Sequence, residues 1–178
     1  VTENKNTKYA TMNFEEAELT KLSINSFVTM KIAYANMLGD ICDKYGANVD
    51  NVTEALGMDT RISPKYMSAG LSFGVTCFPR DVRALQSLVE YVGLDYDISG
   101  SISKSNSIKE LNIAKKIAEG YPKIVNIVGV SYKDDTPVTE ESPSLNIALL
   151  LDKMGIDVKL FDDVETLETV EYNFDRSD

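Results

Sequence analysis

The sequence predicts an α/β protein in two parts: an all-α region built on one long spine helix, then part of a doubly wound, parallel α/β domain. Three patterns predict this fold. Apolar residues keep a helical period from residue 14 to residue 45, and glycines close the helical segments that follow. After residue 122, two short β-branched runs flank one further helical segment. We therefore expect a polar tail over residues 1–12, a helical domain over 13–120 and an α/β domain over 121–178.

The long helix comes first along the chain. Its apolar positions follow one another at steps of three, four and one, with a single step of five, and Gly46 stands where such a helix ends. A helix of about 30 residues spans roughly 45 Å, which suits the spine of a dimer or a bridge between domains. The apolar positions are Leu19, Leu22, Phe27, Met30, Tyr34, Met37, Leu38, Ile41 and Tyr45.

Shorter helices and one long loop follow. Residues 50–56 predict a short helix that Gly57 closes. Residues 58–76 have no period, and loops of that length inside compact domains are usually functional. Pro79 is expected at the first position of a helix that runs to Gly93, and residues 95–119 predict another helix before Gly120.

The α/β part begins after Pro122. Residues 123–130 form a β-branched apolar run typical of a buried parallel strand, and residues 157–161 predict a second strand. Between them, Ser142 and Pro143 are the N-cap and first residue of a helix that Gly155 ends. The result is a right-handed βαβ unit followed by a short acidic tail. Because one such unit cannot cover both faces of a parallel sheet, we expect this domain to be partial or paired.

Composition excludes several kinds of chemistry. The 178 residues include no His, no Trp and two Cys, so a Ser-His-Asp triad and an imidazole metal site are ruled out, and no metal is expected. The net charge of −10 argues against nucleic acid as a partner. No apolar run is long enough for a membrane span, and no signal pattern opens the chain, so we expect no membrane association and a cytoplasmic location.

Cys77 is the first candidate for a chemical role. It closes the long loop next to a predicted helix start, where unpaired N–H groups favour a thiolate. Asp81 lies one turn further along and could reach the same pocket. The alternative is that Cys77 is a small buried hydrophobe. Cys42, on the apolar side of the long helix, is predicted to be a core residue.

Lys21 and Asn25 form the second candidate pair. Their i, i+4 spacing places both on one face of the long helix, and Lys21 is flanked by apolar positions. A lysine at the edge of a pocket can stabilise an oxyanion, although a solvated surface lysine is the simpler interpretation. Gly129 follows a predicted strand, but the sequence after it is GVSYKDD and not GxGxxG. It therefore gives only a weak dinucleotide signal, and the chain has no GxGxxG elsewhere.

Five segments together resemble one family, the UDP-glucose/GDP-mannose dehydrogenases. The CFPRD motif places the resemblance closest to the UDP-glucose 6-dehydrogenase branch of that family, and the matched segments run in family order from about residue 14 to residue 162. The resemblance implies that the α/β domain is Rossmann-like and binds a nucleotide sugar. The segments are EAELTKLSIN, MKIAYANML, GMDTRI, SFGVTCFPRDVRAL and GVSYKDDT.

The resemblance implies two NAD-dependent oxidations of the sugar C6 alcohol to a carboxylate. Cys77 would be the nucleophile that carries a thiohemiacetal and then a thioester, with Lys21 stabilising the oxyanion, Asn25 holding the reacting oxygen and Asp81 orienting or activating water. The long helix 14–45 would form a homodimer, and the substrate would be a UDP-sugar. Arg61 would reach the partner's site, and the residues implied to line the nucleotide-sugar pocket are Tyr66, Phe73, Gly74, Tyr132 and Lys133.

Three departures from the family pattern bear on activity. Val75 and Thr76 stand where the family has a glycine and a serine; if that glycine needs positive φ, either a valine there is strained or the loop has a different shape. Glu140 replaces an arginine expected near the cofactor phosphates, and the N-terminal NAD domain of the family is absent from the 178 residues. We therefore expect no dehydrogenase activity from this chain alone.

Two other functions stay open beside an enzyme portion. The chain could be a non-catalytic dimerisation module derived from the same family, in which the site has drifted. A dehydrogenase of the 6-phosphogluconate or hydroxy-acid type would also combine a Rossmann domain with helices, but it does not account for CFPRD.

Overall fold

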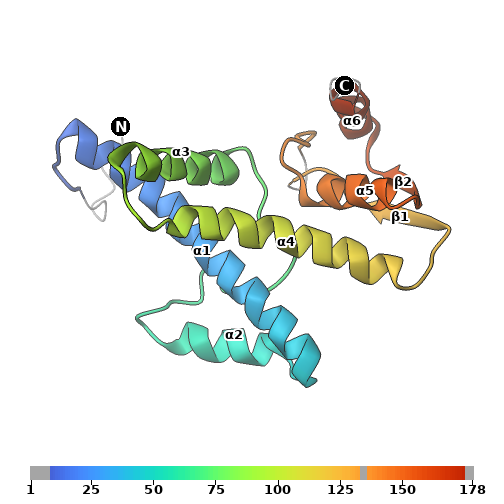
Figure 1. The fold of residues 1–178 in the computed structure, drawn as a ribbon, viewed down its shortest axis with the longest axis horizontal. Coiled ribbons are helices and arrows are strands. Elements are labelled where there is room, and N and C mark those ends of the chain that lie inside the picture. The colour runs from blue at the N-terminus through green and yellow to red at the C-terminus, as the bar shows by residue number, and fades with distance from the viewer. Residues whose placement is uncertain (1–8, 133–135, 175–178) are drawn as a thin grey trace, which may run out of the picture.

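The computed structural model describes residues 9–132 and 136–174, with side chains described as far as Val170. Four helices come first, then a strand, a helix, a second strand and a last helix (Figure 1). The structure is therefore helix-rich with a small parallel sheet. Its elements are α1 (Phe14–Tyr45), α2 (Val49–Met58), α3 (Cys77–Val92), α4 (Ile98–Ala118), β1 (Ile124–Val128), α5 (Pro143–Lys153), β2 (Asp157–Phe161) and α6 (Val164–Phe174).

The long helix α1 forms as predicted. At its start, Asn13 and Glu16 form a reciprocal capping box, with each side chain accepting the other's backbone N–H at 2.8 Å. At its end, Gly46 takes the left-handed conformation with φ of 68°, and its N–H bonds back to Cys42 O. Cys42 is buried, as predicted for a core residue.

The glycine expected to close α2 lies inside that helix instead. Asn48 caps the start of α2, and the helix continues past Gly57 to Met58. A Cβ on Gly57 would lie 2.9 Å from Cα and Cβ of Pro64, so the glycine permits a close approach of the following loop. The prediction that Gly57 ends the helix was wrong because this contact is tertiary and leaves no local signal.

The next helix begins earlier than predicted. α3 starts at Cys77, so Pro79 is its third residue and not its first. A proline fits there because the N–H groups of the first turn have no partner inside the helix. The shift matters for the site, since it places Cys77 in the first turn of α3.

The α/β unit has the predicted βαβ order. β1 and β2 pair in parallel, from Ile124 opposite Asp157 to Val128 opposite Phe161, and Ser142 caps α5. The segment expected to be an acidic tail contains α6, whose start is capped by the Asp163 carboxylate accepting from Thr166 N (2.8 Å). The tail prediction was therefore wrong for residues 164–174.

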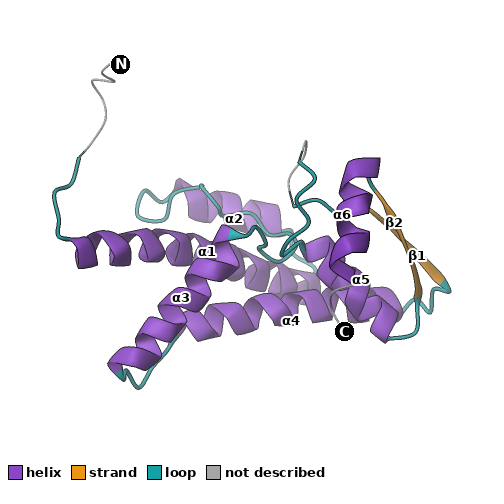
Figure 2. Ribbon diagram, turned by 90° about the horizontal axis from the view of Figure 1, so that it is seen from above, coloured by secondary structure: helices purple, strands orange, loops and turns teal. Residues whose placement is uncertain are grey.

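One face of the sheet is covered and the other is not. Apolar residues of α5, α6 and the end of α4 pack against the inward side chains of the two strands, which include Val125, Ile127, Val158 and Leu160. On the opposite face, Val128 and Phe161 are 80% and 47% exposed. Figure 2 shows both strands at one end of the molecule, with the helices to one side.

Helix α4 joins the two parts of the fold. It packs against α1, α3 and α5, so it runs from the helical region into the α/β unit (Figure 1). Asp97 caps its start through Gly100 N. Among the described residues, no helix combines the length and apolar character needed to cross a membrane.

Candidate functional site

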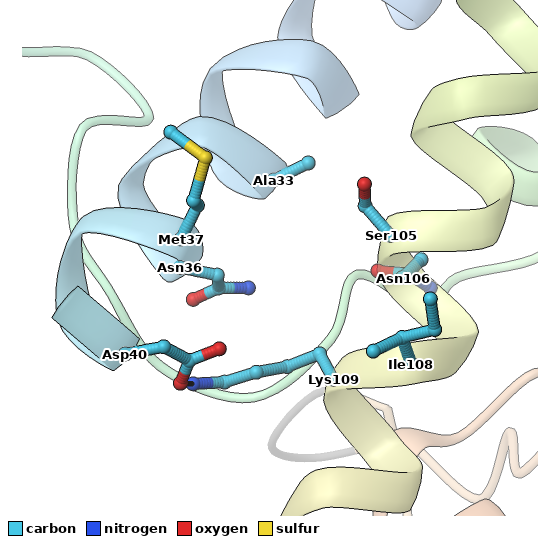
Figure 3. A pocket seen from close by; sticks show the side chains of 8 residues that line it. All are labelled: Ala33, Asn36, Met37, Asp40, Ser105, Asn106, Ile108 and Lys109. Carbon is cyan, nitrogen blue, oxygen red and sulfur yellow. Dashed lines mark hydrogen bonds and ion pairs between the residues drawn. The ribbon is translucent and has the colours of Figure 1, made fainter.

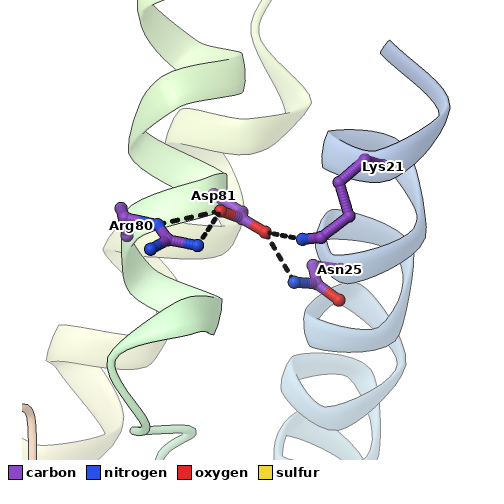
Figure 4. A network of polar contacts seen from close by, with 4 residues as sticks. All are labelled: Lys21, Asn25, Arg80 and Asp81. Carbon is purple, nitrogen blue, oxygen red and sulfur yellow. Dashed lines mark hydrogen bonds and ion pairs between the residues drawn. The ribbon is translucent and has the colours of Figure 1, made fainter. Parts of the chain in front are cut away.

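The buried carboxylate of Asp81 joins α3 to α1. Its Oδ2 accepts hydrogen bonds from Lys21 Nζ (2.5 Å) and Asn25 Nδ2 (2.6 Å), while its Oδ1 accepts from Arg80 Nε and Nη2 (both 3.1 Å) (Figure 4). The i, i+4 spacing of Lys21 and Asn25 brings both side chains to this one oxygen. Three of the four predicted catalytic residues therefore meet in one network.

The network keeps Asp81 ionised although it is buried. Asp81 is 3% exposed. Burial by itself would raise the pKa of Asp81, but hydrogen bonds from Lys21, Asn25 and Arg80 outweigh burial and hold that pKa below its ordinary value of 3.8. The Lys21 side chain is itself 59% exposed, so its ammonium stays accessible to a further oxygen ligand.

Cys77 is an exposed free thiol one turn before Asp81 on the same helix. The preceding residue, Thr76, makes no side-chain cap at the start of α3. Its hydroxyl instead donates to Glu140 Oε2 at 3.3 Å. The first-turn N–H groups of α3 are thus not capped by Thr76 and can stabilise negative charge next to the sulfur.

The long loop carries two more predicted residues in different surroundings. Arg61 pairs with Asp59 (Nη2 to Oδ2, 2.5 Å) and lines a largely apolar pocket between α1 and α2, apart from the Asp81 network. The guanidinium of Arg61 lowers the pKa of Asp59 through its hydrogen bonds. Tyr66 has φ of 62° and packs edge-on against Phe78, with ring centroids 6.5 Å apart.

Phe73 and Gly74 lie where the loop meets the α/β unit. Phe73 is buried, and both its backbone N–H and its C=O bond to the side chain of Asn106 on α4 at 2.8 Å. A Cβ on Gly74 would collide with Glu141 O and lie 2.7 Å from Cδ of Pro143. Only glycine therefore allows the loop to pass this close to the start of α5.

Val75 has the positive φ at which a valine was expected to be strained. Its φ is 72°, in the left-handed region that disfavours β-branched side chains. Such a residue costs on the order of 1–3 kcal/mol and persists only where its surroundings impose the conformation.

The remaining predicted residues follow β1. Tyr132 is half-buried and donates its N–H to Val138 O (3.0 Å), and Lys133 lies outside the described residues. The start of this segment is fixed by Asp162, whose Oδ2 accepts from Val130 N (2.6 Å) and Ser131 N (3.2 Å). Those backbone bonds, the one from Val130 above all, lower the pKa of Asp162.

Three residues that sequence reasoning did not single out shape the long loop. Lys31 Nζ donates to the carbonyls of Ile62 and Ser63 at 3.0 Å, and also to Lys65 O. Asn36 and Asn106 lie on α1 and α4 at a pocket of about 160 Å³, which also holds the Asp40–Lys109 ion pair (Figure 3).

Both amides bond to the backbone of the loop. Asn36 is 4% exposed; its Oδ1 accepts from Gly70 N (2.7 Å), and its Nδ2 donates to Leu71 O (2.8 Å). The only local signal for it was a polar residue on the inner side of an amphipathic helix, and that signal does not reveal a partner 34 residues away.

Comparison with known proteins places the chain in a family. The model of the UDP-glucose/GDP-mannose dehydrogenase family, central domain, matches residues 15–108, more than half of the chain.

The chain belongs to the UDP-glucose/GDP-mannose dehydrogenase family.

Relatives within this family match most of the chain. A UDP-glucose 6-dehydrogenase of Rickettsia typhi is 37% identical over 174 residues, which are 95% of this chain and 40% of that protein. A UDP-glucose 6-dehydrogenase of Bacillus subtilis is 30% identical and matches 85% of this chain and 34% of its own length. The chain thus spans about two fifths of the length of its relatives.

A solved structure supports the fold. The UDP-glucose dehydrogenase of the hyperthermophilic archaeon Pyrobaculum islandicum superimposes with a TM-score of 0.84 at 32% identity, over 93% of this chain and 39% of that one.

The described residues do not fit the NAD that this family implies. Gly129 is the single glycine between β1 and α5, and its N–H is already bonded to Phe161 O at 2.9 Å. No glycine-rich turn opens α5, which begins at Pro143. The carboxylate of Glu140 lies beside Thr76, where it would repel a phosphate.

Proposed function

We propose that the chain is a portion of an NAD-dependent UDP-glucose 6-dehydrogenase, which oxidises the C6 alcohol of the sugar to a carboxylate. One observation supports this function above the others. Cys77 lies in the first turn of α3, one turn before a buried Asp81 that meets Lys21 and Asn25 from α1. A nucleophile, two donors for an oxyanion and a carboxylate are the groups that thioester chemistry needs.

Cys77 acts on the aldehyde that the first oxidation produces. Its sulfur adds to C6, so a C–S bond forms and the carbonyl oxygen becomes an oxyanion that takes up a proton to complete the thiohemiacetal. Lys21 and Asn25 donate hydrogen bonds toward that oxygen. NAD would supply the oxidant for both oxidations, and we assign no residue of this chain to its site.

Release of the product uses the same groups. Once the adduct has been oxidised to a thioester, water attacks C6, the C–S bond breaks and the sulfur leaves as a thiolate. Asp81 orients the water and takes its proton, and Lys21 again stabilises the oxyanion. Because Lys21 and Asn25 bond to Asp81 in the structure, they must turn part of their donor capacity toward the substrate when it binds.

The other predicted residues bind the UDP-sugar in this proposal. Tyr66, Phe73, Gly74, Tyr132 and Lys133 contact the nucleotide sugar, with Phe73 and Gly74 contributing the backbone of a loop that α4 and α5 hold in place. The NAD site belongs to a part of the enzyme other than residues 1–178. These residues alone therefore have no dehydrogenase activity.

We also propose a homodimer through α1, in which Arg61 reaches the partner's site. Phe27, Tyr34 and Ile41 recur every seven residues, and they are 60%, 49% and 43% exposed. A seven-residue apolar repeat on an exposed helix fits a second helix of the same kind. Residues 13–120 and 121–178 are then the dimerisation domain and part of a Rossmann-like nucleotide-sugar domain of a cytoplasmic enzyme.

Alkylation of Cys77 tests the catalytic role. Iodoacetamide is added to the chain over a range of pH, with and without UDP-glucose, and modification of Cys77 and Cys42 is followed separately by peptide mass spectrometry. We expect UDP-glucose to protect Cys77 from alkylation. Cys42 is the internal control because it is buried. Equal modification of Cys77 with and without UDP-glucose would reject the proposal.

That negative result would favour the second candidate, a non-catalytic dimerisation module. Two observations point to it: a valine at φ of 72° two residues before Cys77, and the carboxylate of Glu140 beside Thr76. Sedimentation of Phe27→Glu, with the exposed Glu54→Lys as a charge-change control on α2, would then still show loss of the dimer.

A further inference from the structure

Glu110 is a buried carboxylate with no part in the chemistry described above. It lies on α4 and is 9% exposed. Its Oε1 accepts from Ser72 Oγ (2.6 Å) in the long loop and from Asn146 Nδ2 (3.0 Å) on α5. One oxygen atom therefore joins the helical region, the loop and the α/β unit.

A second side chain on the same face of α4 extends this contact. Asn106 precedes Glu110 by one turn and bonds both backbone groups of Phe73, the residue after Ser72. The next residue, Gly74, lies against the backbone of Glu141 and the ring of Pro143 at the start of α5. Loop residues 72–74 are thus held between α4 and α5, a few residues before Cys77.

The surroundings of Glu110 are polar. A cavity of about 310 Å³ opens beside it, and an ion pair between Arg83 and Glu141 (2.9 Å) lies at the wall. The two hydrogen bonds of Glu110 therefore lie in polar surroundings and constrain the loop together with those of Asn106. The other lining residues are Phe73, Pro79, Gln86, Ser103, Asn106, Ser107 and Asn146.

We propose that Glu110 is a positioning residue, which fixes the loop that leads into Cys77 by tying Ser72 to Asn146 of the α/β unit. The position of the α/β unit relative to α4 then determines where the Cys77 thiol lies at the start of α3. The meaning of this coupling for catalysis rests on the proposed function, but the coupling itself does not.

The test compares four variants of the 178-residue chain without ligand. Glu110→Ala removes the acceptor, whereas Glu110→Gln keeps an amide oxygen that both donors can use. Asn146→Ala removes one of the two bonds and serves if Glu110→Ala does not fold. Ile147→Ala is the matched control, because Ile147 belongs to the apolar cluster between α4 and α5 and neighbours Asn146 in the sequence.

Two local rates and one global property are measured: hydrogen exchange at the Phe73 amide, alkylation of Cys77 by iodoacetamide, and the unfolding midpoint. We expect Glu110→Ala and Asn146→Ala to speed exchange and to slow alkylation by roughly threefold to tenfold, the factor that corresponds to one hydrogen bond. Alkylation slows because a loosened loop no longer fixes the sulfur of Cys77 relative to the start of α3, where unpaired N–H groups favour a thiolate. Glu110→Gln should stay within about twofold of the parent chain, since it keeps the acceptor.

The control separates positioning from stability. Ile147→Ala should lower the unfolding midpoint and leave both local rates unchanged. Two results would overturn the proposal. The first is that Ile147→Ala and Glu110→Ala have the same unfolding midpoint and change the exchange and alkylation rates equally. The second is that Glu110→Gln changes these rates as much as Glu110→Ala does. These rates involve no substrate, so a failure of UDP-glucose to protect Cys77 would count against the proposed function and not against the role of Glu110.

Discussion

Replacing Asp81 by Asn tests the network that joins α1 to α3. Each carboxylate oxygen accepts two hydrogen bonds: Oδ2 accepts from Lys21 and Asn25, and Oδ1 accepts twice from Arg80. Asp81→Asn keeps the shape but turns one oxygen into an NH₂ group. In either orientation of the amide, its NH₂ group faces one of the two pairs of donors that the carboxylate had bonded.

The expected cost follows from the exposure of the partners. The side chains of Lys21 and Arg80 are 59% and 60% exposed, so water can take over their bonds, whereas Asp81 cannot be resolvated without separating the helices. The substitution costs least when the amide oxygen faces α1 and keeps the bonds from Lys21 and Asn25, so that only Arg80 loses its acceptor. We therefore expect Asp81→Asn to lower the free energy of unfolding by about 1–3 kcal/mol. The control Arg80→Gln changes only an exposed partner of Asp81. It should lower the free energy of unfolding by less than about 1 kcal/mol.

The difference in unfolding free energy between the parent chain and Asp81→Asn should depend on pH. Because the pKa of Asp81 is lower in the folded chain than its ordinary value of 3.8, its ionisation stabilises the fold above that value. The contribution is lost as the pH falls through the lower folded pKa. Urea unfolding at pH 7 and at pH 3 measures it: the gap between the parent chain and Asp81→Asn should narrow at pH 3. An equal gap at both pH values would refute the reasoning.

Three further predictions concern the loop and the strand end. Val75→Gly and Val75→Ala remove the same methyl groups, but only glycine relieves φ of 72°, so Val75→Gly should be the more stable variant in urea by about 1 kcal/mol; equal midpoints would contradict the strain. Gly74→Ala places a Cβ 2.7 Å from Pro143 Cδ and should lower stability by about 1–3 kcal/mol, seen as a lower Tm than that of the exposed control Gly70→Ala. Asp162→Ala removes the acceptor of Val130 N–H and should cost about 1–3 kcal/mol at pH 7, with a smaller difference below pH 3.8 because the pKa of Asp162 is lowered in the fold.

The elements with a local signal could be predicted from the sequence. The apolar period and Gly46 gave the length of α1, and Ser142 with Pro143 gave the start of α5. The same rules also applied to α6: Asp163 precedes Val164, Leu167 and Val170, which are spaced as one side of a helix requires, but the acidic residues between them hid this pattern.

Contacts between distant segments could not be predicted in this way. Gly57 was predicted to end a helix, whereas its lack of a side chain allows Pro64 to approach the helix closely. Lys31, Asn36 and Asn106 looked like ordinary polar positions, because a side chain that bonds to backbone 30 residues away leaves no mark on its own neighbours. The family resemblance placed Lys21, Asn25 and Asp81 in one site, but only the packing of α1 against α3 showed that the first two bond directly to the Asp81 carboxylate.

The shape of the long loop is imposed from outside the loop. Three of its residues, Ser63, Tyr66 and Val75, have positive φ although none is glycine, and such conformations persist only where the surroundings fix them. Side chains of α1 and α4 hold the loop in place by bonding to its backbone near each end and in the middle. Those helices also carry Lys21, Asn25 and Glu110. Because α1 both holds the loop and supplies Lys21 and Asn25 to Asp81, a shift of α1 would change the place of Cys77 and the groups around it together.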